Sequence, residues 1–479
     1  MTSYVQAEQA EQPSTDERRA DIPIRHLKVN GGLENPPSVE GDSEGGRGMS
    51  WNEPMISLAD SKYFETLNGL WTGKKEPFVE AGVIRNTNFT SSGAIDFSNI
   101  AYLQVEEKQL SKRRLEAGDI IIERSGGGPK QPVGRVVFFD REDGDFSFSN
   151  FTSAVRVKDK TTVDPHFVFY GLMELYQSGQ TEDIQRRTTG IRNLDFTAYK
   201  ERARFPKIAF PEQKKIAYIL STVQRAIEAQ ERIIQTTMEL KKALMHKLFT
   251  DGLRNEPQKQ TEIGLVPESW ETRKLGDIAT MISKGSSPKW QGFHYTENGI
   301  LFVRSQNVGA GKMLLDSRAY LPATFNDKEK RSILQSGDIL INLVGASIGR
   351  VALGTAEILG GNCNQAVGFV RLEGSKALKQ LIVYFLLSPW GQEQMRRQKK
   401  DIARANLSLL DLRGFEIPIP PTEEEIEDVA NALVTLEEKV TTHELKRDRL
   451  QDLFRTLLHE LMTAKIRVHE IDLEKEVVA

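Results

Sequence analysis

The amino-acid sequence contains the same pattern twice. The segment Gly118–Ile122 reads GDIII and is followed by GRVV at Gly134–Val137. The segment Gly337–Ile341 reads GDILI and is followed by GRVA at Gly349–Ala352. An internal repeat whose units are as large as a domain points to two-fold pseudosymmetry within one polypeptide. We therefore expect this chain to perform one task twice.

The register of the repeat is constant over long stretches. Arg304 follows Arg85 by 219 residues, whereas Arg371 follows Arg156 by 215. The offset changes at the loop Gly126–Lys130, which is longer in the first copy. A shared frame with unlike loops predicts one scaffold that carries two different surfaces.

Each copy is expected to be an α+β domain, because short β-rich runs are followed by a helical stretch. In the first copy the expected strands are residues 83–85, 119–123, 134–139 and 154–157, and the expected helix is residues 167–177. In the second copy the expected strands are residues 300–304, 338–342, 349–353 and 367–372, and the expected helix is residues 378–387.

A long charged segment with heptad spacing follows Pro211 in the first copy and Pro421 in the second. Each predicted helix has roughly 40 residues, and is therefore roughly 60 Å long. The expected apolar stripes are Ile216, Ile219, Val223, Ala226, Ile233, Leu240, Leu244 and Leu248, and Ile426, Val429, Leu433, Leu436, Val440, Leu450, Phe454, Leu457 and Leu461. Polar residues interrupt both stripes, at Gln230 and Thr237 and at His443 and Arg447. An exposed stripe needs a partner, so we expect the two helices to pair antiparallel. A homodimeric coiled coil is the alternative.

These patterns divide the chain into two pseudo-symmetric α/β domains joined by two long antiparallel coiled-coil helices. The expected parts are a disordered tail at 1–48, a first domain at 49–210 and a central helix at 211–256. A second domain at 257–420, a C-terminal helix at 421–467 and a tail at 468–479 follow. The helix at 421–467 is expected to begin with a capping box at Thr422–Glu425.

Composition excludes several classes of protein. Cys363 is the only cysteine and there are seven scattered histidines, so neither a disulfide scaffold nor a zinc cluster is expected. The longest apolar runs are far shorter than a membrane span, and the first residues do not form a secretory signal, so a cytoplasmic location is expected. The net charge of −3 by itself argues against a nucleic-acid ligand. The charges are unevenly distributed, however, and clusters such as Lys112–Arg114 and Arg396–Lys400 are locally basic, which matters more for the attraction of phosphates.

Motifs that suggest catalysis do not recur. Asn35–Ser38 reads NPPS and lacks the aromatic residue with which adenine methyltransferases stack a flipped base. Gly126–Lys130 lacks the spacing of a phosphate-binding loop. Asp119 and Glu123 correspond to Asp338 and Asn342, so a metal-dependent nuclease pair is not repeated. We expect no catalytic residue, no metal site and no cofactor in this chain.

Basic and amide side chains gather in loops at matched places in both copies. Such side chains read base edges and hold phosphates. The predicted DNA-binding residues of the first copy are Lys74, Lys75, Arg85, Asn86, Asn88, Arg124, Ser125, Lys130, Arg186, Arg187 and Arg192. Those of the second copy are Lys284, Ser286, Ser287, Lys289, Trp290, Arg304, Gln306, Asn307, Ser347, Lys399, Lys400 and Arg404. Asn193 and Asn406 have two interpretations, as DNA contacts and, slightly favoured, as turn residues that close each domain onto its helix.

The sequence resembles the DNA-specificity subunit of type I restriction-modification enzymes over about Trp51 to Arg467. The motifs are Val266–Glu271 with Lys274–Ile278, the twin GDI strands, and the helix start PEQKKI at Pro211–Ile216. The chain departs from the family pattern in its long N-terminal tail, in its start at Trp51–Pro54, and at Pro421–Glu425, where the glutamine of the helix start is missing.

The resemblance implies two target recognition domains, each reading one half of a split, asymmetric DNA sequence, with helices that set the gap. It also implies a chain without catalytic activity that docks two methyltransferase subunits, which carry S-adenosylmethionine, and that restriction subunits join. Two alternatives remain: the specificity subunit of a type II enzyme that cuts on both sides of its site, and a coiled-coil scaffold with two protein-binding domains.

Overall fold

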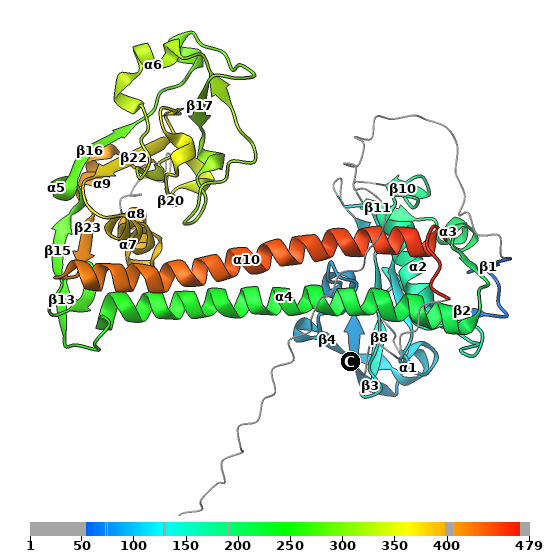
Figure 1. Ribbon diagram of the computed structural model, residues 1–479. Helices are drawn as coiled ribbons and strands as arrows, with labels where there is room; N and C mark the ends of the chain where they lie inside the picture. The colour runs from blue at the N-terminus through cyan, green and yellow to red at the C-terminus, as the bar shows by residue number, and fades with distance from the viewer. Residues whose placement is uncertain are drawn as a thin grey trace, which may run out of the picture. The chain divides into compact units, whose positions relative to one another are not determined.

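The computed structural model describes residues 54–71, 73, 75–127, 131–188, 191–397 and 406–469 (Figure 1). The tail expected at 1–48 lies outside the described residues, as does residue 470 onward of the expected C-terminal tail. Val468, which was assigned to that tail, is 1% exposed and packs into the core of the first domain.

Each domain is built around a four-stranded antiparallel sheet with the same strand order. In the first domain the order is β2 (Phe64–Asn68), β9 (Thr152–Val157), β5 (Ile120–Glu123) and β7 (Val136–Phe138). In the second domain it is β16 (Ala279–Lys284), β22 (Val367–Leu372), β19 (Ile339–Asn342) and β20 (Val351–Leu353). The expected strands are confirmed to within a few residues, and the duplication of the sequence is a duplication of topology.

The smaller sheets are repeated too. A three-stranded sheet has the order β4 (Ala101–Glu106), β3 (Phe78–Ile84) and β8 (Phe146–Phe148) in the first domain. Its counterpart is β18 (Tyr320–Leu321), β17 (Ile300–Val303) and β21 (Asn362–Cys363). In both, the central strand pairs antiparallel with one neighbour and parallel with the other.

The opening strand of each domain pairs with its closing strand. In the first domain β1 (Met55–Ser57) lies antiparallel to β12 (Arg204–Pro206). In the second, β15 (Glu271–Lys274) lies antiparallel to β23 (Glu416–Ile419). A hairpin of β13 (Gln258–Thr261) and β14 (Gly264–Pro267) precedes the second domain's sheets.

Helices cover the sheets in corresponding positions. The main helices are α2 (Pro165–Gln177) and α7 (Lys376–Leu387), and both are largely buried. The shorter helices are α1 (Glu107–Arg113) and α3 (Phe196–Arg202) in the first domain, and α5 (Leu275–Ile278), α6 (Thr324–Lys328), α8 (Pro389–Arg397) and α9 (Leu409–Arg413) in the second.

The repeated GDI motif forms a turn that is fixed by a buried ion pair. Gly118 and Gly337 have φ of +98° and +83°, a conformation that favours glycine. Asp119 is 1% exposed and accepts from Nε and Nη2 of Arg156 at 2.8 and 2.7 Å. Asp338 accepts from the same atoms of Arg371 at 2.8 Å each. The GDI aspartate therefore has a structural role in both domains.

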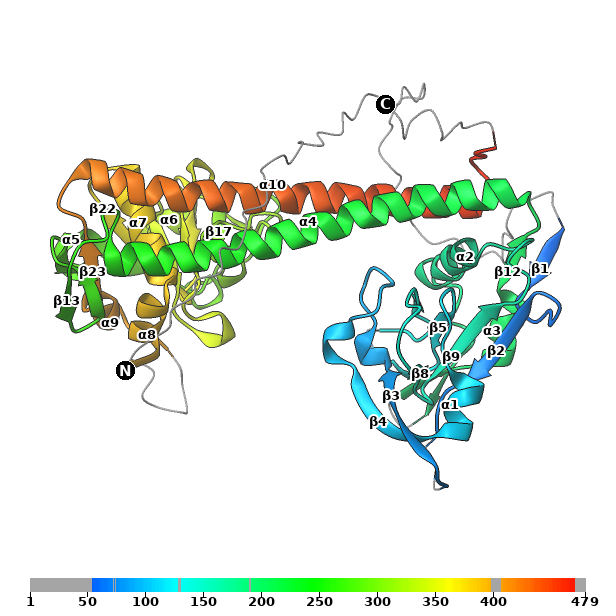
Figure 2. The same cartoon turned by 90° about the horizontal axis from the view of Figure 1, so that it is seen from below.

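Helices α4 (Phe210–Asp251) and α10 (Glu423–Met462) lie side by side and antiparallel, as Figures 1 and 2 both show. The core of the first domain takes in the beginning of α4, at residues 216–227, and the end of α10, at residues 454–462. The core of the second domain takes in the end of α4, at residues 245–249, and the beginning of α10, at Val429 and Leu433. The two helices therefore pair within one chain, as expected.

The predicted stripe of α4 is wrong in the middle of the helix. Leu240 is 55% exposed, whereas Thr237 is buried. The line of contact passes through Ile227, Ile234 and Thr237 to Lys241, whose ammonium group bonds Glu437 of α10. Because polar side chains occupy positions in this seam, a pattern of apolar residues alone leads to the wrong face.

A polar pair lies inside the helix pair. Nδ1 of His443 lies 2.6 Å from Oε1 of Gln230, so the interruptions seen in the two stripes meet. Burial lowers the pKa of His443, and the neutral ring can donate from Nδ1 to the amide oxygen. A polar pair that is satisfied in one alignment only specifies the register of two helices.

The helices end earlier than the sequence indicated. Helix α4 stops at Asp251 because Gly252 adopts φ of +65° as its C-cap, so residues 252–256 are not helical. Helix α10 begins at Glu423, and the Thr422 hydroxyl accepts from the Glu425 backbone at 3.2 Å. This is only half of the expected capping box, since the Glu425 carboxylate accepts from Nε1 of Trp270 at 3.0 Å.

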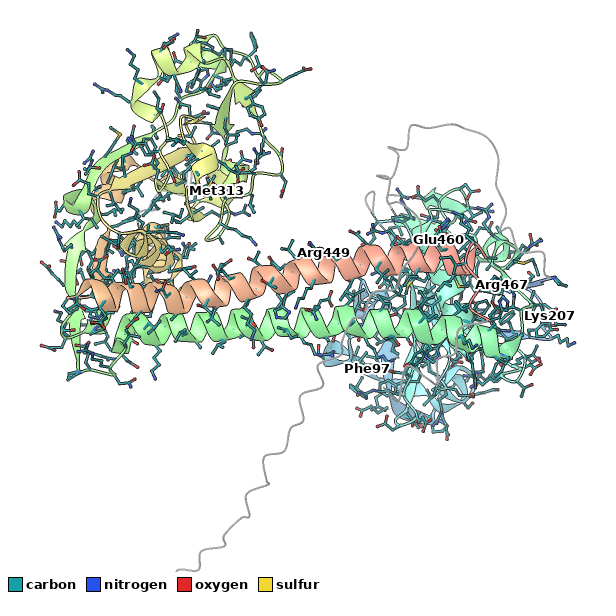
Figure 3. The ribbon with its side chains drawn as sticks, viewed as in Figure 1. Phe97, Lys207, Met313, Arg449, Glu460 and Arg467 are labelled. Atoms are coloured by element: carbon teal, nitrogen blue, oxygen red, sulfur yellow. The ribbon has the colours of Figure 1, made fainter. Side chains whose placement is uncertain are left out.

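The PEQ motif joins the start of α4 to its surroundings. Glu212, which is 3% exposed, accepts from Nε and Nη2 of Arg467 at 2.8 and 2.7 Å; Figure 3 labels Arg467 beyond the end of α10. These bonds lower the pKa of Glu212. Gln213 donates to the carbonyls of Thr162 and Ile208 and accepts from the backbone of Asp164. The motif therefore binds the start of α4 both to the first domain and to the segment that follows α10.

Replacing Trp270 with phenylalanine is expected to destabilise the second domain by about 1–3 kcal/mol, because Glu425 is 6% exposed and loses its indole donor. Thermal unfolding of the purified chain measures this change. Trp290→Phe is the matched control, since Trp290 is 80% exposed and its replacement should leave unfolding unchanged. Equal stability of wild type and Trp270→Phe would contradict the prediction.

Among the described residues, no helix is both long and apolar enough to cross a membrane. In the same part of the chain, no group of three or more His, Cys, Asp or Glu side chains is arranged to hold a metal ion.

Candidate nucleic-acid interface

In each domain the first candidate loop follows the central strand of the three-stranded sheet. The loop Asn86–Asn88 follows β3, and the loop Ser305–Asn307 follows β17. Thr87 and Gln306 are exposed at its tip. Its side chains therefore reach the surface in both domains at matched positions.

Asn88 and Asn307 were predicted to contact DNA, and the structure gives them another role. They are 1% and 2% exposed. Each Oδ1 accepts from the backbone of the matched arginine, Arg85 at 2.9 Å and Arg304 at 3.0 Å. Each Nδ2 donates to two backbone carbonyls. Both residues shape the loop and have no polar atom left for a base.

Arg85 and Arg304 are half-buried, and both are bound to their own domain. Nη2 of Arg85 donates to the Asn99 carbonyl at 3.4 Å, and Nη2 of Arg304 to the Ser317 carbonyl at 3.0 Å. Arg124 is also anchored, because Nη1 donates to Asn68 and its guanidinium lies 4.8 Å from the Phe196 ring centroid. These three arginines support the loops beside which they lie.

The second candidate loop joins a central strand of the four-stranded sheet to the edge strand beside it, β5 to β7 in the first domain and β19 to β20 in the second. In the first domain it contains Ser125, in the short strand β6 (Ser125–Gly127), and in the second it contains Ser347. The first two loops are linked, since Nδ2 of Asn86 donates to the Ser125 carbonyl at 3.2 Å. In the second domain, Nδ2 of Asn342 donates to the Ser305 carbonyl at 2.8 Å. The structure thus brings these two predicted loops together in both copies.

The segment expected to be a basic loop in the first domain is a hairpin. Strand β10 (Gln185–Thr188) pairs with β11 (Ile191–Leu194), which pairs in turn with β6. Arg186 points to solvent, with 78% of its side chain exposed, and bonds Asp195 at 2.7 Å. Arg192 is half-buried and donates to Gln185 at 3.4 Å.

Asn193 and Asn406 are not turn residues that close a domain onto its helix. Asn193 lies in β11 opposite Ser125, and Asn406 forms a bridge to Val344. Val344 follows Ser125 by 219 residues, so the two bridges are equivalent. Both asparagines therefore support the second candidate loop.

The loop at the start of each domain carries exposed basic and aromatic side chains. Lys75, Lys284, Lys289 and Trp290 are exposed, Trp290 to 80%. Ser286 and Ser287 are half-buried, and the Ser286 hydroxyl accepts from Gln291 at 3.0 Å. These lysines are suited to phosphate contacts, because no carboxylate of the described residues forms an ion pair with them.

An apolar hollow of about 520 Å³ borders the first loop of the first domain. Trp71 and Phe151 line it and are 63% and 52% exposed, and Arg85, Asn86 and Thr87 line it as well. Phe151 was missed by sequence reasoning, because no basic residue adjoins it and its exposure depends on the fold. Aromatic rings beside amides offer apolar and polar contacts to a base edge.

Several predicted residues cannot be located. Lys74, Lys130, Lys399, Lys400 and Arg404 lie outside the described residues, as does the side chain of Arg187. Their roles remain predictions.

Comparison with known proteins agrees with this arrangement. The family described as "Type I restriction modification DNA specificity domain" matches twice, at residues 58–237 and 267–451. The type I restriction enzyme MjaVIII specificity subunit of Methanocaldococcus jannaschii is 27% identical over 328 residues, which cover 67% of this chain and 75% of that protein. The putative type I restriction enzyme MjaX specificity subunit of the same organism is 24% identical over 405 residues, covering 84% and 91%.

The fold is similar to that of the type I restriction-modification system S subunit from M. genitalium, a crystal structure. The TM-score is 0.56 at 16% sequence identity, over 87% of this chain and 98% of that one. The two family matches fall on the two repeats, each extending over a globular domain into its long helix. The chain therefore belongs to the family of type I restriction-modification DNA specificity subunits.

Proposed function

We propose that this chain reads a bipartite, asymmetric DNA sequence, with one half-site bound by each globular domain. The observation that supports this most directly is a repeated frame with unlike loops. The sheets have the same strand order, whereas the second candidate loop holds Arg124 and Ser125 in one copy and Val344 and Ser347 in the other. Different side chains on equal frames suit two different half-sites.

The helices are proposed to set the gap between the half-sites, and contacts beyond the cores hold each domain on them. The Ser92 carbonyl of the first domain accepts from Nε2 of Gln224 in α4 at 2.8 Å. Lys312 of the second domain bonds Glu444 in α10 at 2.9 Å. Ser92 and Gly311, next to Lys312, are matched positions, so equivalent loops fasten both domains.

In this proposal the chain catalyses nothing itself. Two methyltransferase subunits would dock on it and carry S-adenosylmethionine, which supplies the methyl group, and restriction subunits would join the complex. The relatives named above are specificity subunits of type I enzymes, and this supports a partner role for the chain.

Lengthening both helices by one turn is expected to widen the gap and to leave both half-sites unchanged. The insertions belong at the same level of α4 and α10, between Ile227 and Gln230 in α4 and between Glu444 and Leu450 in α10, so that the Lys312–Glu444 contact and both cores are kept. One turn adds about 5.4 Å, which corresponds to roughly one to two base pairs of DNA. Sequencing duplexes selected by the complex from a random pool measures the gap.

The control replaces four exposed residues at the same level with alanine and adds no length. It should select the wild-type gap. An unchanged gap in the lengthened chain would refute the proposal that the helices act as a ruler, while two unchanged half-sites would still support the assignment of one half-site to each domain.

A further inference from the structure

Arg135 and Arg350 occupy equivalent positions in the repeat, and among the described residues only the side chain of Arg135 has partners in its domain. Nε and Nη2 of Arg135 donate to the Glu123 carboxylate at 2.8 and 2.9 Å, and Glu123 is 1% exposed. Nη2 also donates to the Asn86 carbonyl at 3.0 Å. The guanidinium lies 5.5 Å from the Phe89 ring centroid. Arg135 is therefore fixed beneath the first candidate loop.

Each of these contacts is replaced around Arg350. Glu123 corresponds to Asn342, Asn86 to Ser305 and Phe89 to Val308, all at the offset of 219. The carboxylate that neutralises the arginine is thereby exchanged for a neutral amide, and the aromatic ring for an aliphatic side chain.

Asn342 also takes over the bond that Arg135 makes to the loop. Its Nδ2 donates to the Ser305 carbonyl at 2.8 Å, and the matched Asn86 carbonyl is the one that accepts from Arg135. Asn342 is 0% exposed, and its Oδ1 has no donor among the described residues. The loop is thus held without the arginine.

Arg350 is exposed, and its side chain makes no hydrogen bond or ion pair within the described part of the chain. Its backbone donates to the Ser347 carbonyl at 3.2 Å, so it lies at the base of the second candidate loop. Residues 343–349 contain no charged side chain, whereas the matched loop contains Arg124 and Lys130. Arg350 is the single positive charge that this hairpin can offer to DNA.

We propose that Arg350 is a DNA-contacting residue of the second domain, released for that task by the exchange of Glu123 for Asn342 between the copies. The inference rests on the proposed function. A free guanidinium beside groove-reading loops binds a phosphate or the O6 and N7 edge of guanine.

The test uses the full chain with its methyltransferase subunits and a labelled duplex carrying the sequence that the wild-type complex selects from a random pool. Arg350→Ala is expected to weaken binding roughly tenfold. Asn342→Glu is expected to weaken it to a similar extent, because the new carboxylate recaptures Arg350 as Glu123 holds Arg135. The double variant should be no weaker than either single variant, since both remove the same contact.

Arg413→Ala is the matched control, an exposed arginine of α9 outside the candidate loops, and it should bind like wild type. Thermal unfolding checks that the Asn342→Glu variant is folded. The Arg350→Ala variant changes an exposed position and therefore tests the proposal even if Asn342→Glu does not fold. A selected sequence altered in the second half-site identifies a base contact, and a salt dependence reduced by about one charge identifies a phosphate contact; either supports the proposal.

If the wild-type complex binds the duplex and the Arg350→Ala complex binds it with the same affinity, the role proposed for Arg350 is overturned and the proposed function stands. A wild-type complex that binds no duplex, or binds without salt dependence, would instead overturn the proposed function.

Discussion

The affinity of the complex for its DNA site is expected to fall roughly a thousandfold between about 50 and 200 mM salt. Lysines and arginines that contact phosphates release condensed counterions on binding, and each contact contributes about one unit to the slope of log affinity against log salt. Lys75, Lys284, Lys289 and Arg350 are exposed in the candidate loops. The net charge of −3 does not oppose this, because local charge governs phosphate attraction.

Fluorescence anisotropy with a labelled duplex over a salt series measures this slope. Lys284→Ala combined with Lys289→Ala should lower the slope by about two. Lys274→Ala combined with Lys376→Ala removes the same charge from exposed positions outside the candidate loops and should leave the slope unchanged. Affinity that is insensitive to salt would favour a scaffold that binds proteins.

Arg371→Ala is expected to destabilise the second domain by about 3–5 kcal/mol, because it leaves Asp338 buried and without its charged partner. Arg156→Ala should have the same effect on the first domain through Asp119. Hydrogen exchange resolved along the sequence identifies the domain that loosens.

Arg318→Ala is the control for this comparison, since Arg318 and Glu357 form an ion pair with both side chains about half exposed. Its loss should not change unfolding measurably. If a single variant loosens both domains, the domains do not unfold as separate units. If both variants are as stable as wild type, the structural role of the GDI aspartates is contradicted.

The fold was predictable from the sequence because the repeat could be aligned residue by residue. Gly118 and Gly337 mark the same turn. The offset of 215 aligns Arg156 with Arg371, and these two arginines are the ion-pair partners of the two buried aspartates. The antiparallel helix pair followed from the same alignment. Leu240 was misplaced because the seam between the helices accepts Thr237 and Lys241, which apolar spacing does not predict.

The candidate interface was less predictable, because a residue type does not reveal what stands opposite it. Asn88 and Asn307 have the chemistry of base-reading residues, yet buried backbone groups use all of their polar atoms. Arg135 and Arg350 are both flanked by glycine and valine, and the fold shows that the first guanidinium is neutralised and the second exposed. The offset of 219 that pairs Glu123 with Asn342 was the available signal.

The pairing of opening and closing strands bears on how such a chain can change its target. Strands β1 and β12 pair in the first domain, and β15 and β23 pair in the second, so the first and last strands of each domain lie side by side. A recombination event with breakpoints beside such a strand pair would exchange a whole domain as a cassette. Under the proposed function, the helices and the half-site assigned to the other domain would be inherited intact.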